Sequence, residues 1–378
     1  MTPPPKYSVN GIFIDNENWG NYKVNHLDLD THIVNEVERM LNCCNPKKGF
    51  FVGYCEKCKK EVIIHLRCNG RICNRCGRSY VERWMRKAKN KIFKERHRLV
   101  TLTVPADLRP ILQNRWDLLK VLQDSAHEAI KKTVRKEVGK KVEVGVLIGL
   151  QTFGQAANFH PHLHCLVLDK AKYKEGFASF YRIPFDFLRK TWQDVLIKNL
   201  CRTRVSEEER GLIISMKEKY PDGFIVDPGK SSMNWQGVVK YLARYMRHPA
   251  VANSRIIFYG KDRITIRMRD KQKREYSIWM TAEEFIERLI QHIPSKNFKV
   301  IRWYGLYSRR NVRLERLESR GRQETISVFF SGNRGVVKCP DCGEKVECVF
   351  VPSEKPPDER ILRGKMNYWL EEVAVANV

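Results

Sequence analysis

The chain has 378 residues, enough for two or three domains with buried cores. Its 70 Lys and Arg residues outnumber 43 Asp and Glu residues, and the formal net charge of +27 favours nucleic acid over a membrane surface as the partner. We find neither an apolar run of about eighteen residues nor the basic-then-apolar start of a secretory signal, which predicts a cytoplasmic, nucleoid-associated protein. Twelve cysteines in a reducing compartment favour metal binding over disulfides.

The first segment, residues 1–40, is a comparatively acidic lead-in that ends in a helix-like stretch, HIVNEVERML, to which we assign no chemistry. Residues 41–95 are predicted to form a zinc-binding and DNA-binding domain. It contains closely spaced cysteines followed by a basic stretch with helical spacing, SYVERWMRKAKNKIFKERH.

Two CxxC pairs mark this domain, Cys55 with Cys58 and Cys73 with Cys76. Their spacing predicts four thiolates around one tetrahedral, structural zinc ion. Four neighbouring residues could replace one of these ligands or build a second site, namely Cys43, Cys44, His65 and Cys68. Four arginines lie among the ligands and are expected to form a DNA-binding surface: Arg67, Arg71, Arg75 and Arg78.

The third segment, residues 96–311, reads as an α+β catalytic domain with a central antiparallel sheet and flanking helices. We expect strands at 97–105, 145–154, 161–169, 254–260 and 263–270, and helices at 114–138, 187–200, 235–248 and 281–293. A Gly/Pro/Asp-rich loop is expected at 220–230, and a segment of alternating basic and aromatic residues, 298–313, closes the region.

The segment NFHPHLHCLVLD places histidines at every second position of an apolar strand, so His160, His162 and His164 should share one face. Two neutral imidazoles there could chelate a divalent cation, and His162 and His164 are the predicted ligands. Gln151, on the preceding strand, is the expected third ligand, with Gln155 as the alternative. The open coordination positions indicate Mg²⁺ or Mn²⁺ holding a phosphate.

In the helix VVKYLARYMRH, Val239, Leu242, Ala243 and Met246 form a buried stripe. Tyr241 and Tyr245 share a different face, with Arg244 and Arg247 nearby as candidate DNA contacts. A tyrosine hydroxyl can attack phosphorus if a metal neutralises the phosphate and the phenolic proton is removed.

Residues 312–352 contain a linker and a second cysteine cluster. Cys339, Cys342 and Cys348 supply three thiolates, one fewer than a closed zinc site needs, so either one of the additional N-terminal residues such as Cys44 completes the site or the knuckle is degenerate. Cys165 and Cys201 are expected to be buried hydrophobic residues. Residues 353–378 form a tail with Pro and mixed charge.

Taken together, HPHLHCLV with the upstream GLQTFGQ resembles the metal motif of HUH endonucleases, and YLARY resembles the paired nucleophiles of two-tyrosine transposases of the insertion-sequence 91 family. The likeness extends over roughly residues 40 to 310. It implies an HUH-like fold, tyrosine nucleophiles at Tyr241 and Tyr245, and metal ligands at His162 and His164. Gln151 falls where several family members have histidine.

This resemblance implies a transposase that nicks and transfers single-stranded DNA by a rolling-circle-like route through 5′-phosphotyrosine intermediates. Its partners would be the element's ends and the target. The alternatives are a plasmid or phage replication initiator or relaxase, and a non-catalytic zinc DNA-binding protein.

Overall fold

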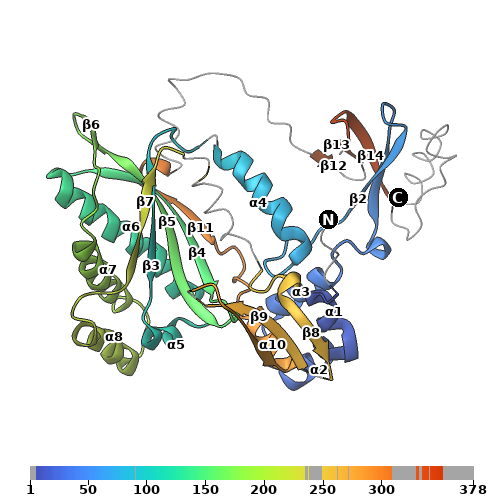
Figure 1. Cartoon of the computed structure of the whole chain (residues 1–378), viewed down its shortest axis with the longest axis horizontal. Coiled ribbons are helices and arrows are strands. Elements are labelled where there is room, and N and C mark those ends of the chain that lie inside the picture. Colours follow the sequence, from blue (N-terminus) through green and yellow to red (C-terminus); the bar gives the residue numbers. More distant parts are fainter. Residues whose placement is uncertain are drawn as a thin grey trace. The chain divides into compact units, whose positions relative to one another are not determined.

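The computed structural model describes residues 6–89, 91–234, 237, 249–261, 263–270, 272–308, 329–331, 334–339 and 341–351 (Figure 1). The chain divides into two compact units, one made of residues 1–34 and 71–320 and the other of residues 35–70 and 321–378. Apart from residue 237, the helix expected at 235–248 lies outside the described residues. None of the helices within the described ranges is long and apolar enough to cross a membrane.

The larger unit contains a mixed α+β arrangement, as expected, around an antiparallel sheet in the order β11-β4-β5-β3-β7. Its strands are β3 (His97–Thr103), β4 (Glu143–Phe153), β5 (Phe159–Tyr173), β7 (Val226–Ser232) and β11 (Ile301–Tyr304), with β6 (Gly176–Ser179) paired to the end of β5. The first three lie where the sequence predicts strands. The loop expected at 220–230 is wrong in part, because β7 begins within it.

Alternation along β5 divides this sheet into two different faces. Leu163, Cys165 and Val167 face the main core, formed with α5 (Arg109–Leu112), α6 (Trp116–Val138), α7 (Phe185–Leu200) and α8 (Glu207–Lys219). Leu166 and Leu168 belong to a second core with Ala88, which lies on α4 (Asn74–Lys89). His162 and His164 are in phase with this second set, so they lie on the face opposite α6 and α7.

A second, three-stranded sheet of the same unit consists of β8 (Ile256–Gly260), β9 (Arg263–Arg269) and β10 (Glu275–Met280). Helix α10 (Ala282–Ile290) follows it and begins with a capping box between Thr281 and Glu284. Two short helices, α1 (Val9–Ile14) and α2 (Asn18–Asn25), pack against α10, as Figure 1 shows, and lie in the lead-in for which only the helix HIVNEVERML is predicted. Helix α3 (Thr31–Leu41) confirms the helix expected from HIVNEVERML.

The smaller unit contains a five-stranded sheet in the order β12-β13-β14-β1-β2. It consists of β1 (Phe50–Cys55), β2 (Lys60–His65), β12 (Phe329–Ser331), β13 (Arg334–Lys338) and β14 (Lys345–Val351). Strand β1 pairs with β14, with Gly53 opposite Cys348. A side chain at position 53 would lie 2.2 Å from the Glu347 carbonyl oxygen, so only glycine fits. The two cysteine-containing segments therefore share one sheet.

Candidate functional site

Strand β5 presents three imidazoles in a row on the sheet face opposite α6 and α7. The ring centroids of His160 and His162 are 5.2 Å apart, and those of His162 and His164 are 4.9 Å apart. Strand β3 places Thr103 opposite His162 and Thr101 opposite His164. The expected alternation of the three histidines is therefore present.

Hydrogen bonding and burial set the protonation state of these imidazoles. His162 Nδ1 lies 2.8 Å from the His160 carbonyl oxygen, which can only accept, so Nδ1 carries the proton and Nε2 retains its lone pair. Burial lowers the pKa of His162, and burial with the neighbouring His162 lowers the pKa of His164 to about 3. Burial and the charge of Arg109 lower the pKa of His160 to about 4. All three are neutral at pH 7, which is the form that binds a metal ion.

Gln151 on β4 lies directly opposite His162 in the antiparallel ladder. Its Nε2 donates to the Phe153 carbonyl oxygen at 3.1 Å, which fixes which end of the amide is oxygen. Its Oε1 is buried and has no hydrogen-bond partner within the part of the chain that the structure describes. A buried, unsatisfied amide oxygen is unfavourable, so a cation bound there would offset its desolvation.

Gln155, the alternative third ligand, is differently placed. Its Oε1 accepts a hydrogen bond from the backbone N–H of Arg269 at 3.3 Å, and its carbonyl oxygen accepts one from Arg255 at 2.5 Å. Its amide oxygen therefore has a protein partner, whereas that of Gln151 has none among the residues that the structure describes. Both glutamines line a cleft, hereafter the histidine cleft, with Phe153, Gly154, His160, His162, Ala250 and Arg255.

The donor set of the histidine cleft differs from that of a closed structural site. Among the described residues, groups of three or more Cys, His, Asp or Glu ligand atoms within 4.8 Å of one another occur at two places, and both are cysteine clusters. The cleft lining offers the imidazoles of His160 and His162 and the amide oxygen of Gln151, an open, nitrogen- and oxygen-rich set, while the predicted ligand His164 is the next histidine along β5 and is not part of that lining. Such a set fits a hard or borderline divalent cation with free positions for substrate.

Two arginines near the cleft were not singled out from the sequence. Arg109 contributes a positive charge that lowers the pKa of His160 and His162, and its buried Nε has no hydrogen-bond partner among the described residues. Arg255 lines the cleft and donates to the carbonyl oxygens of Gln155 and Arg267. Neither belongs to a motif, so no spacing pattern could have identified them. The predicted nucleophiles Tyr241 and Tyr245, with Arg244 and Arg247, lie outside the described residues.

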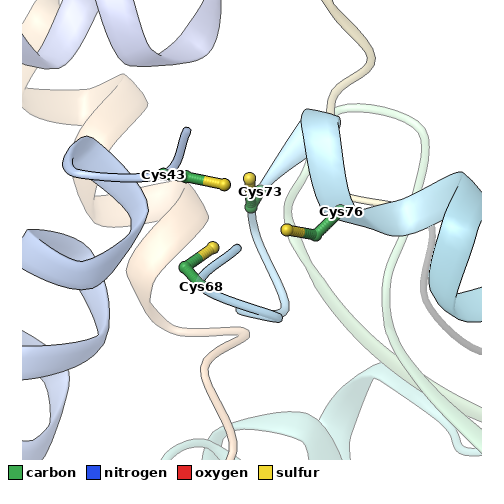
Figure 2. Close-up of side chains that lie close together, drawn as sticks. All are labelled: Cys43, Cys68, Cys73 and Cys76. Atoms are coloured by element: carbon green, nitrogen blue, oxygen red, sulfur yellow. The ribbon is translucent and has the colours of Figure 1, made fainter. Parts of the chain in front are cut away.

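The first cysteine cluster consists of Cys43, Cys68, Cys73 and Cys76, whose sulfur atoms all lie within 4.8 Å of one another. Figure 2 shows the four side chains pointing toward a common centre. All four are buried, and the backbone N–H of Gly70 donates to Cys68 Sγ at 3.3 Å. Four thiols in this arrangement fit tetrahedral zinc.

The second cluster consists of Cys55, Cys58, Cys339 and Cys342, also within 4.8 Å of one another. Cys55 Sγ lies 3.6 Å from Cys342 Sγ, and Cys58 Sγ lies 3.9 Å from Cys339 Sγ. Backbone N–H groups of Cys342 and Asp341 lower the pKa of Cys339 to about 7, which favours a thiolate there, whereas the hydrogen bond with Cys342 and burial raise the pKa of Cys58 to about 12. Metal binding to this cluster would therefore release a proton from Cys58.

These clusters correct the predicted grouping. Cys55 and Cys58 do not share a site with Cys73 and Cys76, because the pairing of β1 with β14 brings the β1–β2 turn beside the β13–β14 turn. Cys73 and Cys76 instead share a cluster with Cys43 and Cys68, which are two of the four additional residues that the sequence left open as ligands.

Cys348, expected as a ligand with Cys339 and Cys342, is instead a buried residue of β14. Its neighbours are apolar, and burial raises its pKa to about 11. Cys165 is fully buried, as expected, while Cys201 is half-buried. Of the arginines expected on a DNA-binding surface, Arg67 and Arg75 are exposed and Arg71 is buried. The Arg78 side chain lies outside the described residues.

The structure therefore defines the class as an α+β protein with two four-cysteine clusters that could hold zinc and a separate cleft lined by histidine and glutamine side chains. Residues 14–104 match the family model described as "Transposase zinc-binding domain", and residues 145–314 match the one described as "Putative transposase". The chain belongs to the insertion-sequence 91 family of transposases, and its partner is DNA.

Two curated relatives agree with this assignment. The chain is 24% identical over 329 residues to "Transposase for insertion sequence element IS801" of Pseudomonas savastanoi pv. phaseolicola, covering 82% of this chain and 77% of that protein. It is 22% identical over 309 residues to "Putative transposase y4qJ" of Sinorhizobium fredii, covering 76% of this chain and 78% of that protein. No solved structure gives a significant match.

Proposed function

We propose that this transposase cuts and transfers single-stranded DNA by a rolling-circle-like mechanism, with Tyr241 and Tyr245 as nucleophiles and an HUH-type metal site. The observation that carries the proposal is the buried Oε1 of Gln151, which lacks a protein partner among the described residues and lies across the ladder from His162. An amide oxygen beside two neutral imidazoles is explained by a cation bound between them.

The ligands of this cation would be Gln151 Oε1 with the imidazoles of His162 and His164. When bound, Mg²⁺ or Mn²⁺ would polarise a phosphate and neutralise its charge. The hydrogen bond from His162 Nδ1 to the His160 carbonyl oxygen keeps the Nε2 lone pair available. Arg109 and Arg255 are positioned to add positive charge beside a phosphate in the histidine cleft.

In the cleavage step a tyrosine oxygen would attack phosphorus, and the bond from phosphorus to the 3′ oxygen would break. The tyrosine loses its phenolic proton, and the leaving strand gains a proton to become a free 3′-OH. The product is a 5′-phosphotyrosine that keeps the phosphodiester energy for rejoining. With two tyrosines, the donor and target strands could both be held covalently during exchange.

The test is a covalent-adduct assay with purified full chain, Mn²⁺ or Mg²⁺, and labelled single-stranded DNA that carries an element end, resolved on a denaturing gel. An EDTA-sensitive adduct is expected with the wild type and is lost in the Tyr241→Phe/Tyr245→Phe double variant. Tyr181→Phe is the matched control, since Tyr181 is 80% exposed on the connection between β6 and α7 and should leave adduct formation unchanged. Tight DNA binding without an adduct under either metal would instead identify a non-catalytic DNA-binding protein.

A further inference from the structure

The sheet β8-β9-β10 has one buried face and one face open to solvent. Ile264, Ile266 and Met268 of β9 are buried, while the alternating Arg263, Arg267 and Arg269 are exposed. Strand alternation assigns these two sets to opposite faces. The exposed set defines a surface that we call the β9 platform.

Two aromatic rings share the β9 platform. Thr265 of β9 pairs with Phe258 of β8 on one side and with Trp279 of β10 on the other, so both rings lie on the arginine-bearing face. A β-bulge between Ile256 and Phe258 explains why residues two apart face opposite sides of the sheet. Phe258 is 45% exposed and Trp279 is 63% exposed. Strand spacing places the two positions roughly 10 Å apart across the sheet.

The charge on the platform complements a polyanion. The Arg263 guanidinium lies 5.5 Å from the centroid of the Trp279 ring, in a cation–π contact. The Glu275 carboxylate forms ion pairs with two arginines: Oε1 lies 2.7 Å from Arg269 Nη2, and Oε2 lies 3.8 Å from Arg267 Nε. One negative charge therefore neutralises only part of the two positive charges. Exposed aromatic rings interleaved with arginines are the arrangement on which single-stranded nucleic acid stacks its bases and places its phosphates.

The platform also adjoins the histidine cleft. The backbone N–H of Arg269 donates to Gln155 Oε1 at 3.3 Å, and Arg255 Nε donates to the carbonyl oxygen of Arg267 at 3.1 Å. Gln155 and Arg255 both line the cleft. One end of β9 is therefore hydrogen-bonded to the cleft wall.

We propose that the β9 platform binds single-stranded DNA next to the cleavage site, with Phe258 and Trp279 as base-stacking residues. The inference rests on the proposed function for the identity of its ligand. It commits to a single strand because bases in a duplex are already stacked on one another and offer no free ring face.

The test measures binding of a fluorescein-labelled oligothymidylate to the full chain by fluorescence anisotropy in EDTA, so that no chemistry occurs. Phe258→Ala and Trp279→Ala are each expected to weaken binding about tenfold, in keeping with the loss of one stacked base, and Trp279→Phe should retain most of the affinity. Tyr181→Ala removes an even more exposed aromatic ring, from the β6–α7 connection, and should bind like the wild type. Affinity for a duplex should change little in every variant.

Wild-type affinity in the folded Phe258→Ala/Trp279→Ala double variant would overturn the inference, whether or not the chain forms the tyrosine adduct. So would a shift of oligomeric state in Trp279→Ala, measured by sedimentation, without a change in DNA affinity, because it would identify the platform as a protein contact. Weaker oligothymidylate binding in these variants would support the platform even in a preparation that forms no adduct. The missing adduct would then count only against the proposed chemistry.

Discussion

Gln151 on β4 and His162 on β5 face each other across the antiparallel ladder, with Gln151 Nε2 held by the Phe153 carbonyl oxygen and His162 Nδ1 held by that of His160. These two hydrogen bonds leave an amide oxygen and an imidazole nitrogen as the atoms available to a cation. Each of the two side chains is thus oriented by a hydrogen bond to a backbone carbonyl oxygen, as metal ligands generally are.

Gln151→Ala should therefore weaken Mn²⁺ binding strongly, because it removes a metal ligand. Loss of a residue that only hydrogen-bonds to a ligand already costs ~10- to 100-fold in metal affinity, and the loss here should be at least as large. Gln151→His should retain binding, since imidazole is a good ligand for the same ions. Mn²⁺ affinity is measured by electron paramagnetic resonance titration of the purified chain. Gln155→Ala is the control, and a larger loss in this variant than in Gln151→Ala would reverse the assignment of the third ligand.

The cysteine clusters predict two zinc ions per chain. Cys58→Ser should lower the zinc content to one, because it removes a thiolate from the cluster that Cys339 and Cys342 complete. Cys348→Ala should keep both ions, since Cys348 is a core residue of β14. Native mass spectrometry counts the ions directly. Loss of one zinc ion in Cys348→Ala as well as in Cys58→Ser would restore the grouping expected from the sequence, in which Cys348 is a ligand with Cys339 and Cys342.

Local patterns predicted the elements whose periodicity is complete within one segment. The alternation of NFHPHLHCLVLD gives β5, and the stripe in residues 114–138 gives α6. Strand β7 was missed because it contains Pro228 and Gly229, which usually indicate a loop. It is the edge strand of the sheet, where proline is tolerated, and a side chain at Gly229 would lie 2.3 Å from the Leu99 carbonyl oxygen.

The candidate site was predictable only where its residues are close in sequence. The histidine row and the opposing Gln151 belong to two successive strands, so a short connection sufficed to place them. Cys55 and Cys342 are 287 positions apart, and their approach depends on the pairing of β1 with β14, for which a single sequence carries no signal. The same holds for Arg255, which reaches the cleft through tertiary packing.

Arg98 and Asp169 form a buried ion pair that joins β3 to β5. Arg98 Nε lies 2.8 Å from Asp169 Oδ1, both side chains are only 6% exposed, and Ser231 of β7 also donates to the carboxylate. Arg98→Met leaves a buried carboxylate without its cation and should lower the free energy of unfolding by about 3–5 kcal/mol.

Urea denaturation of the Arg98→Met variant measures this loss. The control is Lys132→Met, which removes the exposed ion pair with Glu128 and should cost about 0–1 kcal/mol. The Arg98→Met/Asp169→Leu variant should recover part of the stability, because it removes the uncompensated charge. Equal losses in Arg98→Met and Lys132→Met would show that the buried pair contributes no more than a surface pair.

His292 predicts a specific dependence of stability on pH. Its Nε2 donates to the Ala157 carbonyl oxygen at 2.9 Å, its Nδ1 lies 3.0 Å from Thr152 Oγ1, and it is 1% exposed. Burial lowers its pKa to about 4 from 6.5. The unfolded chain therefore binds this proton more readily than the folded protein does. The contribution to stability is complete above about pH 6.5 and is lost as the pH falls toward 4.

Between pH 7 and pH 5 this single group should lower the free energy of unfolding by about 2 kcal/mol. Other buried histidines titrate over the same range, so the measurement is a comparison of urea denaturation curves for the wild type and His292→Gln at both pH values. The glutamine amide can still donate to Ala157 but cannot take up a proton, so the variant should lose about 2 kcal/mol less than the wild type over this interval. If both proteins lose the same free energy, the pKa of His292 in the folded chain is close to its value in the unfolded chain, and burial does not hold the imidazole neutral.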